Sequence, residues 1–470
     1  MTNRFLGLTD IERDQMLGAL GFGSLDDLFS AVVPPEHQYS GKMTELGDAK
    51  SELEVRLHLA EIAFQNRNVE PQAIFIGGGH YQREIPSANQ MIAGRGEWMT
   101  PYTPYQAEAA QGILATLIDY QSLVKEMTGM KIANAGLYHG ANSLVEATFM
   151  ACRITGRNKV LYSEGLHPTA IANLQTAFNP KIYSQEFELA SIPSTNGITL
   201  SKTIEELVDD KTAAVIVQNP NFFGLLDGMD DHADAIHEKG ALYISYGGGD
   251  QISLALIKPP GEFGAAIYAG EGQHFGIPVG YGGPHIGMLA MSASLDDSGG
   301  KNIRQLPGRL ILQAEDMNGK RAFRLGLQTR EQHIRRERAT SNTCTAETLI
   351  AVMSTIWFAI KGEAGVREAA SQSYHIAHYL AGEISKLPGY NLLYGGNFFN
   401  EFVVQAPQPA SKIVNALSGR GIFAGVPLEE RFPNSGFEEN SILMAATEMN
   451  NSKAHIGKLL EGLAYYGTAN

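Results

Sequence analysis

The 470-residue chain has few cysteines and a deficit of basic residues. Its two cysteines, Cys152 and Cys344, form no C-x-x-C pair, so the sequence predicts neither a disulfide framework nor a metal site. Lys and Arg total 36 against 50 Asp and Glu, which gives a formal net charge of −14. A strongly acidic chain is a poor binder of nucleic acid or of an anionic membrane surface, so both classes of partner are excluded.

Long apolar runs and targeting features are also missing. The first residues, MTNRFLGLTD, lack the basic start and the apolar run of a signal peptide. No apolar stretch approaches the roughly 18 residues that a membrane-spanning helix needs. We therefore expect a cytoplasmic protein without a membrane span, and its length suits two packed domains.

Residues 1–70 predict a helical N-terminal arm. Thr9 and Glu12 have the spacing of a capping box, and Ser24 can cap a second short helix. The run SELEVRLHLAEIAFQNRN (residues 51–68) predicts a longer amphipathic helix.

Residues 71–370 predict a large α/β domain, and residues 371–470 predict a smaller α+β domain. In the first range, helical segments alternate with the strand-like runs KVLYSEGLHP, KIYSQEF, AAVIVQNPN and ALYISYGGGD. Such alternation is typical of a mainly parallel sheet covered by helices on both faces. A long helical stretch, with a break expected at Gly362 to Gly365, leads to strand, helix, strand and helix in the second range.

One basic run, TREQHIRRER (residues 329–338), stands out against the acidic composition. Glu331 and Glu337 interrupt it, and on a helix Glu331 would face Arg335. The pattern favours a charged helix face or a subunit contact over a phosphate-binding patch.

Glycine-rich strand ends carry the candidate binding residues. In YHGANSLVEATFMA, the helix start at Gly140 and the hydroxyl of Ser143 can bind a phosphate, or can form an ordinary cap. His167, in SEGLHP, can stack on a cofactor ring or cap a helix. Asp250, in YISYGGGD, can pair with a pyridinium nitrogen or act as a turn residue.

The segment GEGQHFGIPVGYGGP (residues 270–284) lies where pyridoxal-phosphate enzymes of this architecture carry their cofactor-binding lysine, yet it contains no lysine. Lys258 lies too close to Asp250 in sequence, and Lys301 lies beyond the glycine-rich loop. The order of features therefore matches a pyridoxal fold that lacks its essential nucleophile.

The segment TPYTPYQAEAAQG (residues 100–112) displays Tyr102 and Tyr105 on either side of Pro104. Proline disfavours helix in the residue before it, so the segment is expected to be stiff and extended. The two rings can line a pocket or a partner's surface, or they can be buried against the sheet, and both readings stay open.

Six motifs in order resemble the P-protein (glycine decarboxylase) family of the glycine cleavage system, and in particular its subunit 1 or the N-terminal half of its single-chain members. They are YTPYQAEAAQG, LVKEMTGMKIANAGLYHGA, VQNPNFFG, LIKPPGEFGA, GEGQHFGIPVGYGGPHIG and LQTREQHIRRERATSNTCTAE. The arm and the small domain also fit, so the resemblance covers nearly the whole chain. It implies the fold-type I architecture of pyridoxal-phosphate-dependent transferases. His139 stands where the family usually has aspartate.

The resemblance also implies a division of labour between two unlike subunits. Pyridoxal 5'-phosphate would be bound covalently by a lysine-bearing subunit 2, while Gln273 stands at the lysine position of this chain. The vestigial pocket of this chain would then contain Gly140, Ser143, His167 and Asp250. The residues contributed to the shared catalytic site would be Tyr102, Tyr105 and Glu108.

Function and partners follow from the same resemblance. Together with subunit 2, in a heterotetramer with two copies of each subunit, the chain would decarboxylate glycine and pass the aminomethyl group to the lipoyl arm of H-protein. It would be active only in that complex. The alternative is a lysine-less pseudoenzyme that acts as a scaffold or regulator. An independent pyridoxal enzyme is disfavoured because the amide of Gln273 cannot bind the cofactor covalently.

Overall fold

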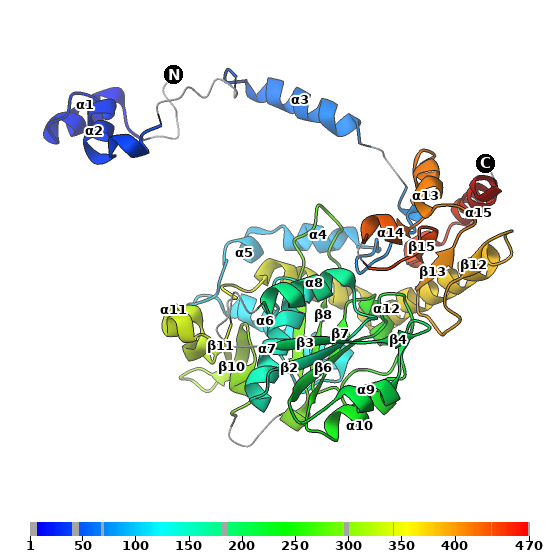
Figure 1. Cartoon of the computed structure of the whole chain (residues 1–470). Helices are drawn as coiled ribbons and strands as arrows, with labels where there is room; N and C mark the ends of the chain where they lie inside the picture. Colours follow the sequence, from blue (N-terminus) through cyan, green and yellow to red (C-terminus); the bar gives the residue numbers. More distant parts are fainter. Residues whose placement is uncertain are drawn as a thin grey trace. The chain divides into compact units, whose positions relative to one another are not determined.

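The chain folds as two units, Met1–Arg67 and Asn68–Asn470, in the computed structural model of Figure 1. The structure describes residues 7–39, 47–66, 70–179, 187–295, 300–341, 343–433 and 435–468. The three-part division at residues 70 and 370 stays a prediction.

The first unit is helical. Its helices are α1 (Asp10–Ala19), α2 (Leu25–Val32), the 3-10 helix η1 (Pro35–His37) and α3 (Glu52–Phe64). The capping box at α1 is confirmed, because Thr9 accepts the Glu12 N–H and the Glu12 carboxylate accepts the Thr9 N–H. Ser24 caps α2 by accepting the Asp27 N–H, as predicted.

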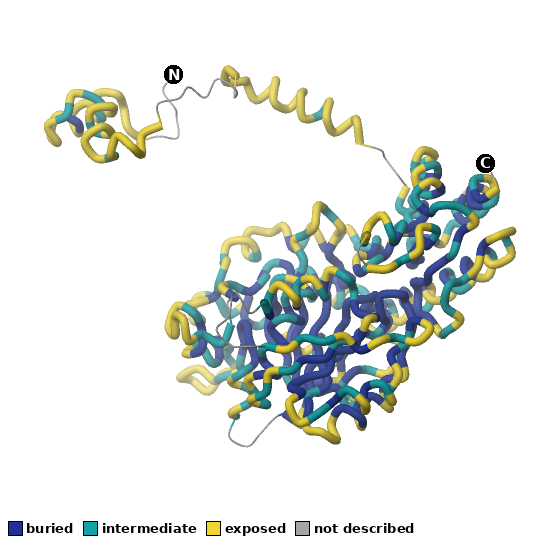
Figure 2. The backbone as a smooth tube through the Cα atoms, viewed as in Figure 1, coloured by how far each residue is buried: buried dark blue, intermediate teal, exposed yellow. Residues whose placement is uncertain are grey.

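Helix α3 departs from the amphipathic pattern expected of it. At 3.6 residues per turn its apolar side chains fall on two opposite faces. One face carries Leu53, Leu57 and Phe64, and the other carries Val55, Leu59 and Ile62. All six side chains are exposed, and the exposed colouring of this unit is visible in Figure 2. The expectation was wrong because alternate positions, rather than every third or fourth, carry the apolar residues.

The second unit contains a seven-stranded sheet in the order β1-β9-β8-β7-β6-β2-β3. Its strands are β1 (Ile132–Ala133), β2 (Lys159–Ser163), β3 (Glu188–Ile192), β6 (Thr212–Gln218), β7 (Leu242–Gly247), β8 (Ile267–Glu271) and β9 (Gly287–Met291). The neighbouring strands β3, β2, β6, β7 and β8 run parallel to one another. Strand β9 pairs antiparallel with β8 on one side and with β1 on the other. Strands β2, β6 and β7 confirm three of the predicted runs. The fourth, KIYSQEF, lies outside the described residues except for its last position.

Helices pack against both faces of this sheet, whose strands form the buried, dark blue interior in Figure 2. Val215 and Val217 of β6 belong to one core, together with residues of α6 (Gln111–Thr128) and α10 (Met229–His237). The alternate residues Ala214 and Ile216 belong to the other core, together with residues of α7 (Gly140–Thr155) and α8 (Pro168–Ala177). The two-sided burial of a mainly parallel sheet is thus confirmed.

A smaller antiparallel sheet follows in the order β12-β13-β15-β14. Its elements are β12 (Asn391–Leu392), β13 (Glu401–Gln405), α13 (Ala410–Ser418), β14 (Val426–Pro427), β15 (Ser441–Ala445) and α15 (Lys453–Thr468). The predicted alternation of strand and helix in this range is confirmed. The backbone of Phe75 reaches this sheet from far away in sequence, because its carbonyl accepts the Ala445 N–H of β15 at 3.0 Å.

Helix α12 (Thr348–Ile384) contributes residues to two hydrophobic cores. Trp357 is buried in the core of the large sheet, and Leu380 is buried in the core of the small sheet. The expected break is found at Gly362, where φ is 60°. The predicted boundary at residue 370 falls inside this helix. Among the described helices, α12 has the length and composition of a membrane span, but a core helix of a soluble protein meets the same test.

The basic run at residues 329–338 does not form a single charged helix face, one of its two expected readings, and the other, a subunit contact, stays a prediction. The run folds as three short turns, η7 (Gln328–Arg330), α11 (Gln332–Arg335) and η8 (Arg336–Arg338). Glu331 is buried and lies 3.5 Å from Arg309 instead of facing Arg335 across a helix turn. Arg309 precedes an unpredicted hairpin of β10 (Leu310–Glu315) and β11 (Arg321–Gly326).

A buried polar network joins the two sheets. The guanidinium of Arg83 pairs with Asp250, which follows β7, and with Glu448, which follows β15. Nearby, the carboxylate of Glu401 on β13 accepts the Gly78 N–H at 2.6 Å and the Tyr81 hydroxyl at 2.8 Å. Burial raises the pKa of Glu401 to about 8.

The pKa of Glu401 gives the first prediction. Its folded-state value lies above its ordinary value of 4.5, so the folded chain binds this proton more tightly than the unfolded chain. The resulting stabilisation is present below about pH 4.5 and is lost as pH rises to about 8, at up to ~1.4 kcal/mol per pH unit. The side chain of Glu401→Gln stays neutral at every pH. The free energy of unfolding of this variant should therefore rise relative to that of the wild type as pH increases through this window.

Urea denaturation at several pH values between about 5 and 8 measures this difference. The exposed residue Glu439 supplies a matched control, Glu439→Gln, which should follow the wild-type pH dependence. Parallel pH profiles for the wild type and Glu401→Gln would contradict the assignment.

Candidate functional site

A cavity of about 530 Å³ opens at the carboxyl ends of the parallel strands, where ligands bind in sheets of this kind. His167 follows β2, Gly248 follows β7 and Glu271 ends β8, and all three line the cavity. Arg431 and Phe432, which come from the region of the small sheet, also line the cavity.

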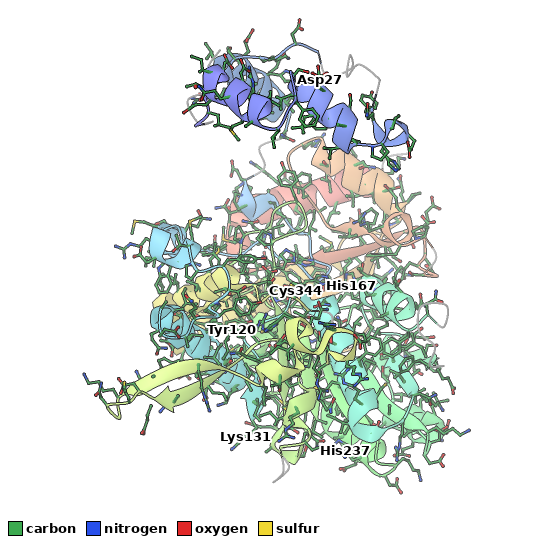
Figure 3. All side chains as sticks on the ribbon, turned by 90° about the vertical axis from the view of Figure 1, so that its left-hand side faces the viewer. Asp27, Tyr120, Lys131, His167, His237 and Cys344 are labelled. Carbon is green, nitrogen blue, oxygen red and sulfur yellow. The ribbon has the colours of Figure 1, made fainter. Side chains whose placement is uncertain are left out.

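His167, which Figure 3 labels, lines this cavity and is oriented by its neighbours. Its Nδ1 accepts the Thr169 N–H at 3.0 Å, so it caps α8, and its Nε2 lies 3.0 Å from Gly78 O. Because Nδ1 is an acceptor, the proton is on Nε2 and is donated to that carbonyl. Burial lowers the pKa of His167 to about 4, so the ring is neutral at pH 7.

Some backbone donors of the predicted phosphate-binding turn at the start of α7 are bonded within the chain. The Gly140 N–H donates to the Glu271 carboxylate at 2.9 Å, and the Asn142 N–H donates to His139 Nδ1 at 3.3 Å. Position 140 requires glycine, because a Cβ there would lie 2.9 Å from the backbone nitrogen of Glu271. Ser143 is buried, and its hydroxyl has no hydrogen-bond partner among the described residues.

Asp250 does not line the cavity. It belongs to the buried polar network that joins the two sheets. One carboxylate oxygen pairs with the Arg83 guanidinium and also accepts a hydrogen bond from the Asn400 amide at 2.6 Å. The other oxygen accepts the Ile252 N–H at 3.2 Å, which makes Asp250 the cap of a 3-10 helix, η4 (Gln251–Ala255).

Gln273 is buried and acts as a clamp on another segment. Its side-chain oxygen accepts the Tyr81 N–H at 3.1 Å, and its Nε2 donates to Tyr81 O at 3.2 Å and to Ile277 O at 2.7 Å. Its own backbone N–H donates to Glu271 at 2.9 Å. The next residue, His274, lies 3.1 Å from Gly79 O through its Nε2.

Tyr102, Tyr105 and Glu108 lie on the irregular segment before α6, outside the lining of the cavity. Tyr102 is 75% exposed and Tyr105 is 50% exposed, so burial of the rings against the sheet is wrong. The guanidinium of Arg309 donates to the Tyr105 hydroxyl at 3.1 Å and contacts its ring. Arg309 also donates to the carbonyl of Cys344, which Figure 3 labels.

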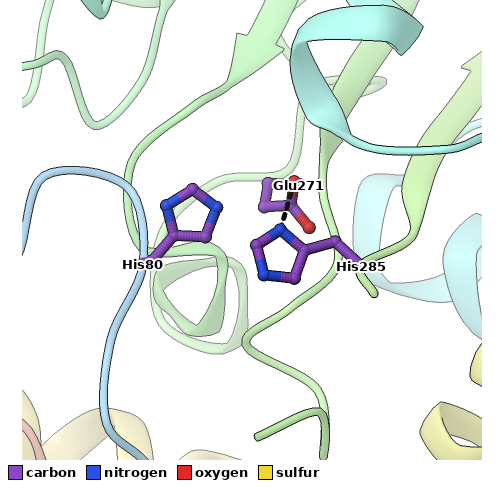
Figure 4. A group of neighbouring side chains, drawn as sticks. All are labelled: His80, Glu271 and His285. Atoms are coloured by element: carbon purple, nitrogen blue, oxygen red, sulfur yellow. Dashed lines mark ion pairs between the residues drawn. The ribbon is translucent and has the colours of Figure 1, made fainter. Parts of the chain in front are cut away.

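Three residues that the sequence did not single out meet in the cavity: His80, Glu271 and His285 (Figure 4). His285 Nδ1 lies 3.8 Å from Glu271, and the rings of His80 and His285 stack with centroids 4.5 Å apart. Burial raises the pKa of Glu271 to about 7. The only signal in the sequence was that both histidines follow glycine-rich turns, which is too weak to join positions so far apart.

Comparison with known proteins places these features in a family. The family profile described as glycine cleavage system P-protein matches residues 3–463. A relative from Chlorobium luteolum, named probable glycine dehydrogenase (decarboxylating) subunit 1, is 39% identical over 98% of this chain and 99% of its own length. A protein of the same name from Moorella thermoacetica is 38% identical over 95% of this chain and 96% of its own length.

Solved structures agree with the sequence comparison. The crystal structure of a glycine decarboxylase (P-protein) of the glycine cleavage system, in inhibitor-bound form, superposes with a TM-score of 0.86 at 37% identity, over 99% of this chain and 100% of that one. A NifS-like protein (TM-score 0.60, 12% identity, 84% of this chain and 98% of that one) shares the fold alone. The predicted fold-type I architecture of pyridoxal-phosphate-dependent transferases is thus confirmed. The chain belongs to the glycine cleavage system P-protein family.

Proposed function

We propose that the chain is subunit 1 of glycine decarboxylase in the glycine cleavage system, and that it acts in the cytoplasm with a lysine-bearing subunit 2. The observation that carries this proposal is the match over nearly the full length to proteins named subunit 1, a name that implies a second subunit. Together the two subunits decarboxylate glycine and pass the aminomethyl group to the lipoyl arm of H-protein. The complex is a heterotetramer with two copies of each subunit.

In this proposal the cofactor, pyridoxal 5'-phosphate, is bound covalently by subunit 2. Three contacts support that assignment. The amide of Gln273 is committed to the backbone of Tyr81, Asp250 is paired with Arg83, and the Gly140 N–H is taken by Glu271. The lysine that would link the cofactor is therefore absent, and the carboxylate that would pair with its ring nitrogen and one backbone donor to its phosphate are occupied. The residues present do not fit pyridoxal phosphate as a resident group of this chain.

The contribution of this chain to the shared site is the exposed segment that carries Tyr102, Tyr105 and Glu108. Pro104 is buried and anchors the segment between the two tyrosines. Because Arg309 donates to the oxygen of Tyr105, the hydroxyl proton of Tyr105 stays free to be donated to an anionic group. A substrate carboxylate is such a group, so the segment can bind and orient glycine while the cofactor of subunit 2 serves as the electron sink.

Reduction with borohydride tests where the cofactor is attached. After treatment of the reconstituted complex, peptide mass spectrometry should find the phosphopyridoxyl group on subunit 2 and none between Asp250 and Lys301 of this chain. Exchange of glycine carboxyl with bicarbonate should require both subunits. An adduct in that range of this chain would overturn the assignment, and full exchange by subunit 2 alone would favour the scaffold alternative.

Tyr102→Phe and Tyr105→Phe test the shared site, because each change removes only a hydroxyl. A lost hydrogen bond to a charged group costs roughly 1.5–3 kcal/mol, so the exchange rate should fall about 10- to 150-fold. The melting temperature of the complex should change little for Tyr102→Phe, since that ring is exposed, whereas Tyr105→Phe also removes the acceptor of the buried Arg309 and should lower it slightly. Tyr379→Phe, at an exposed tyrosine of α12, is the matched control and should keep the wild-type rate. Wild-type exchange in both test variants would rule out the proposed role.

A further inference from the structure

The cluster of His80, Glu271 and His285 has the composition and spacing of a metal site. Each residue offers one ligand atom, and the three atoms lie within 4.8 Å of one another (Figure 4). Ligands of a tetrahedral zinc ion, at bond lengths of 2.0–2.2 Å, are separated by about 3.4 Å. His285 Nδ1 and the Glu271 carboxylate, at 3.8 Å, are already near that separation. The ring of His80 is exposed and stacks on that of His285, so a small rotation would bring its nitrogen to the remaining ligand distance.

The backbone fixes two of the three ligands relative to each other. Glu271 is the last residue of β8 and pairs with Gly287 of the antiparallel strand β9. The Gly272 N–H donates to Ile286 O at 2.8 Å, which continues the ladder beyond β8. His285 precedes that bonded residue, and the ladder therefore holds its ring beside the carboxylate of Glu271.

The third ligand is held by the loop that lacks a lysine. Gln273 bonds both backbone groups of Tyr81, and His274 contacts the carbonyl of Gly79, so the residues on both sides of His80 are fixed. Gln273 also donates its N–H to Glu271, and Gly140 donates to the other oxygen of that carboxylate. Such outer contacts orient first-sphere ligands in metal sites, and here they come from residues outside the cluster.

Charge and hydrogen bonding agree with this geometry. The buried carboxylate of Glu271 has no Lys or Arg within ion-pair distance among the described residues, and buried carboxylates are normally paired or bound to a cation. The ring nitrogens of His80 and His285 have no hydrogen-bond partner in the described part of the chain. By contrast, both ring nitrogens of His167, in the same cavity, are engaged.

We propose that His80, Glu271 and His285 bind a divalent transition-metal cation of the zinc class, with at least one coordination position open to the cavity. Two imidazoles and one carboxylate with an open position form a ligand set known for zinc, and imidazole also suits other first-row metals. The site is independent of the proposed decarboxylase function. No metal ligand was predicted from the sequence, because the three residues share no motif and meet only through the β8–β9 ladder and the Gln273 clamp.

Metal titration of the full-length chain tests the proposal. The titrated protein has no affinity tag. It carries the change Cys344→Ser, because this exposed thiol is an alternative zinc ligand. After chelator treatment, Zn²⁺ competition against a chromophoric chelator should give one bound ion per chain. Co²⁺ should give a visible absorption band typical of nitrogen and oxygen ligands in a site with fewer than six ligands. Fe²⁺ and Mn²⁺, in separate titrations, establish the preference of the site.

The variants His80→Ala, His285→Ala and Glu271→Gln each remove one ligand. Loss of a supporting contact alone costs 10–100-fold in metal affinity, so loss of a ligand should weaken Zn²⁺ binding by about 100-fold or more. The melting temperature should rise with Zn²⁺ in the wild type and not in these variants. His139→Asn is the matched control, because it removes a histidine of the same cavity while keeping a residue that can cap α7.

Three results would overturn the proposal: no Zn²⁺ binding below about 0.1 mM, unchanged binding in both histidine variants, or equal loss in His139→Asn. If one variant fails to fold, the other two decide, because each removes a different ligand. Repetition of the titration on the complex with subunit 2 shows whether the site survives assembly. Loss of Zn²⁺ binding in the complex would overturn the proposal for the assembled enzyme and leave it only for the free chain.

Discussion

The buried guanidinium of Arg83 is the contact on which the arrangement of the second unit depends. It pairs with one carboxylate beside the large sheet, Asp250, and with one beside the small sheet, Glu448. Removing one member of a buried ion pair leaves an uncompensated charge and typically costs 3–5 kcal/mol, so the two sheets are held together by charge as well as by apolar packing.

The segment around Arg83 has little regular structure, yet it contacts the small sheet, the residues that follow β7 and β8, and helix α12. Phe75 joins the small sheet, Gly78 binds Glu401, and Tyr81 is held by Gln273. Further along, the carbonyl of Glu84 accepts the indole N–H of Trp357 in α12 at 3.3 Å. A short stretch of irregular chain thus orders both sheets, the long helix and the wall of the cavity.

Sequence reasoning reached the elements that depend on local pattern. The seven-residue strand β6 is apolar nearly throughout, and α12 breaks at a glycine whose φ is positive, so both could be read from neighbouring residues. The caps at Thr9 and Ser24 are equally local. The fold class came from the alternation of such elements and from the family resemblance.

The missed features depend on contacts between distant positions. The turns at residues 329–338 form because Glu331 is buried against Arg309, which no i,i+4 pattern can show. Arg83 carries no local sign of its two carboxylate partners, and the exposed Tyr102 could not be told from a buried ring. The cluster of His80, Glu271 and His285 exists only once the antiparallel β9 is added to the sheet. The candidate site was therefore predictable as a region but not as a set of contacts.

The clamp at Gln273 limits which other side chains this position can accept. A lysine at this position would lose the paired bonds to Tyr81 and would place an ammonium group in a fully buried space. In addition, Asp250 is already paired with Arg83, and the Gly140 N–H at the start of α7 is already bonded to Glu271. A lysine-linked pyridoxal site in this chain would therefore require replacements at several of these positions together, because one set of buried hydrogen bonds holds Gln273, Tyr81 and Glu271 at once.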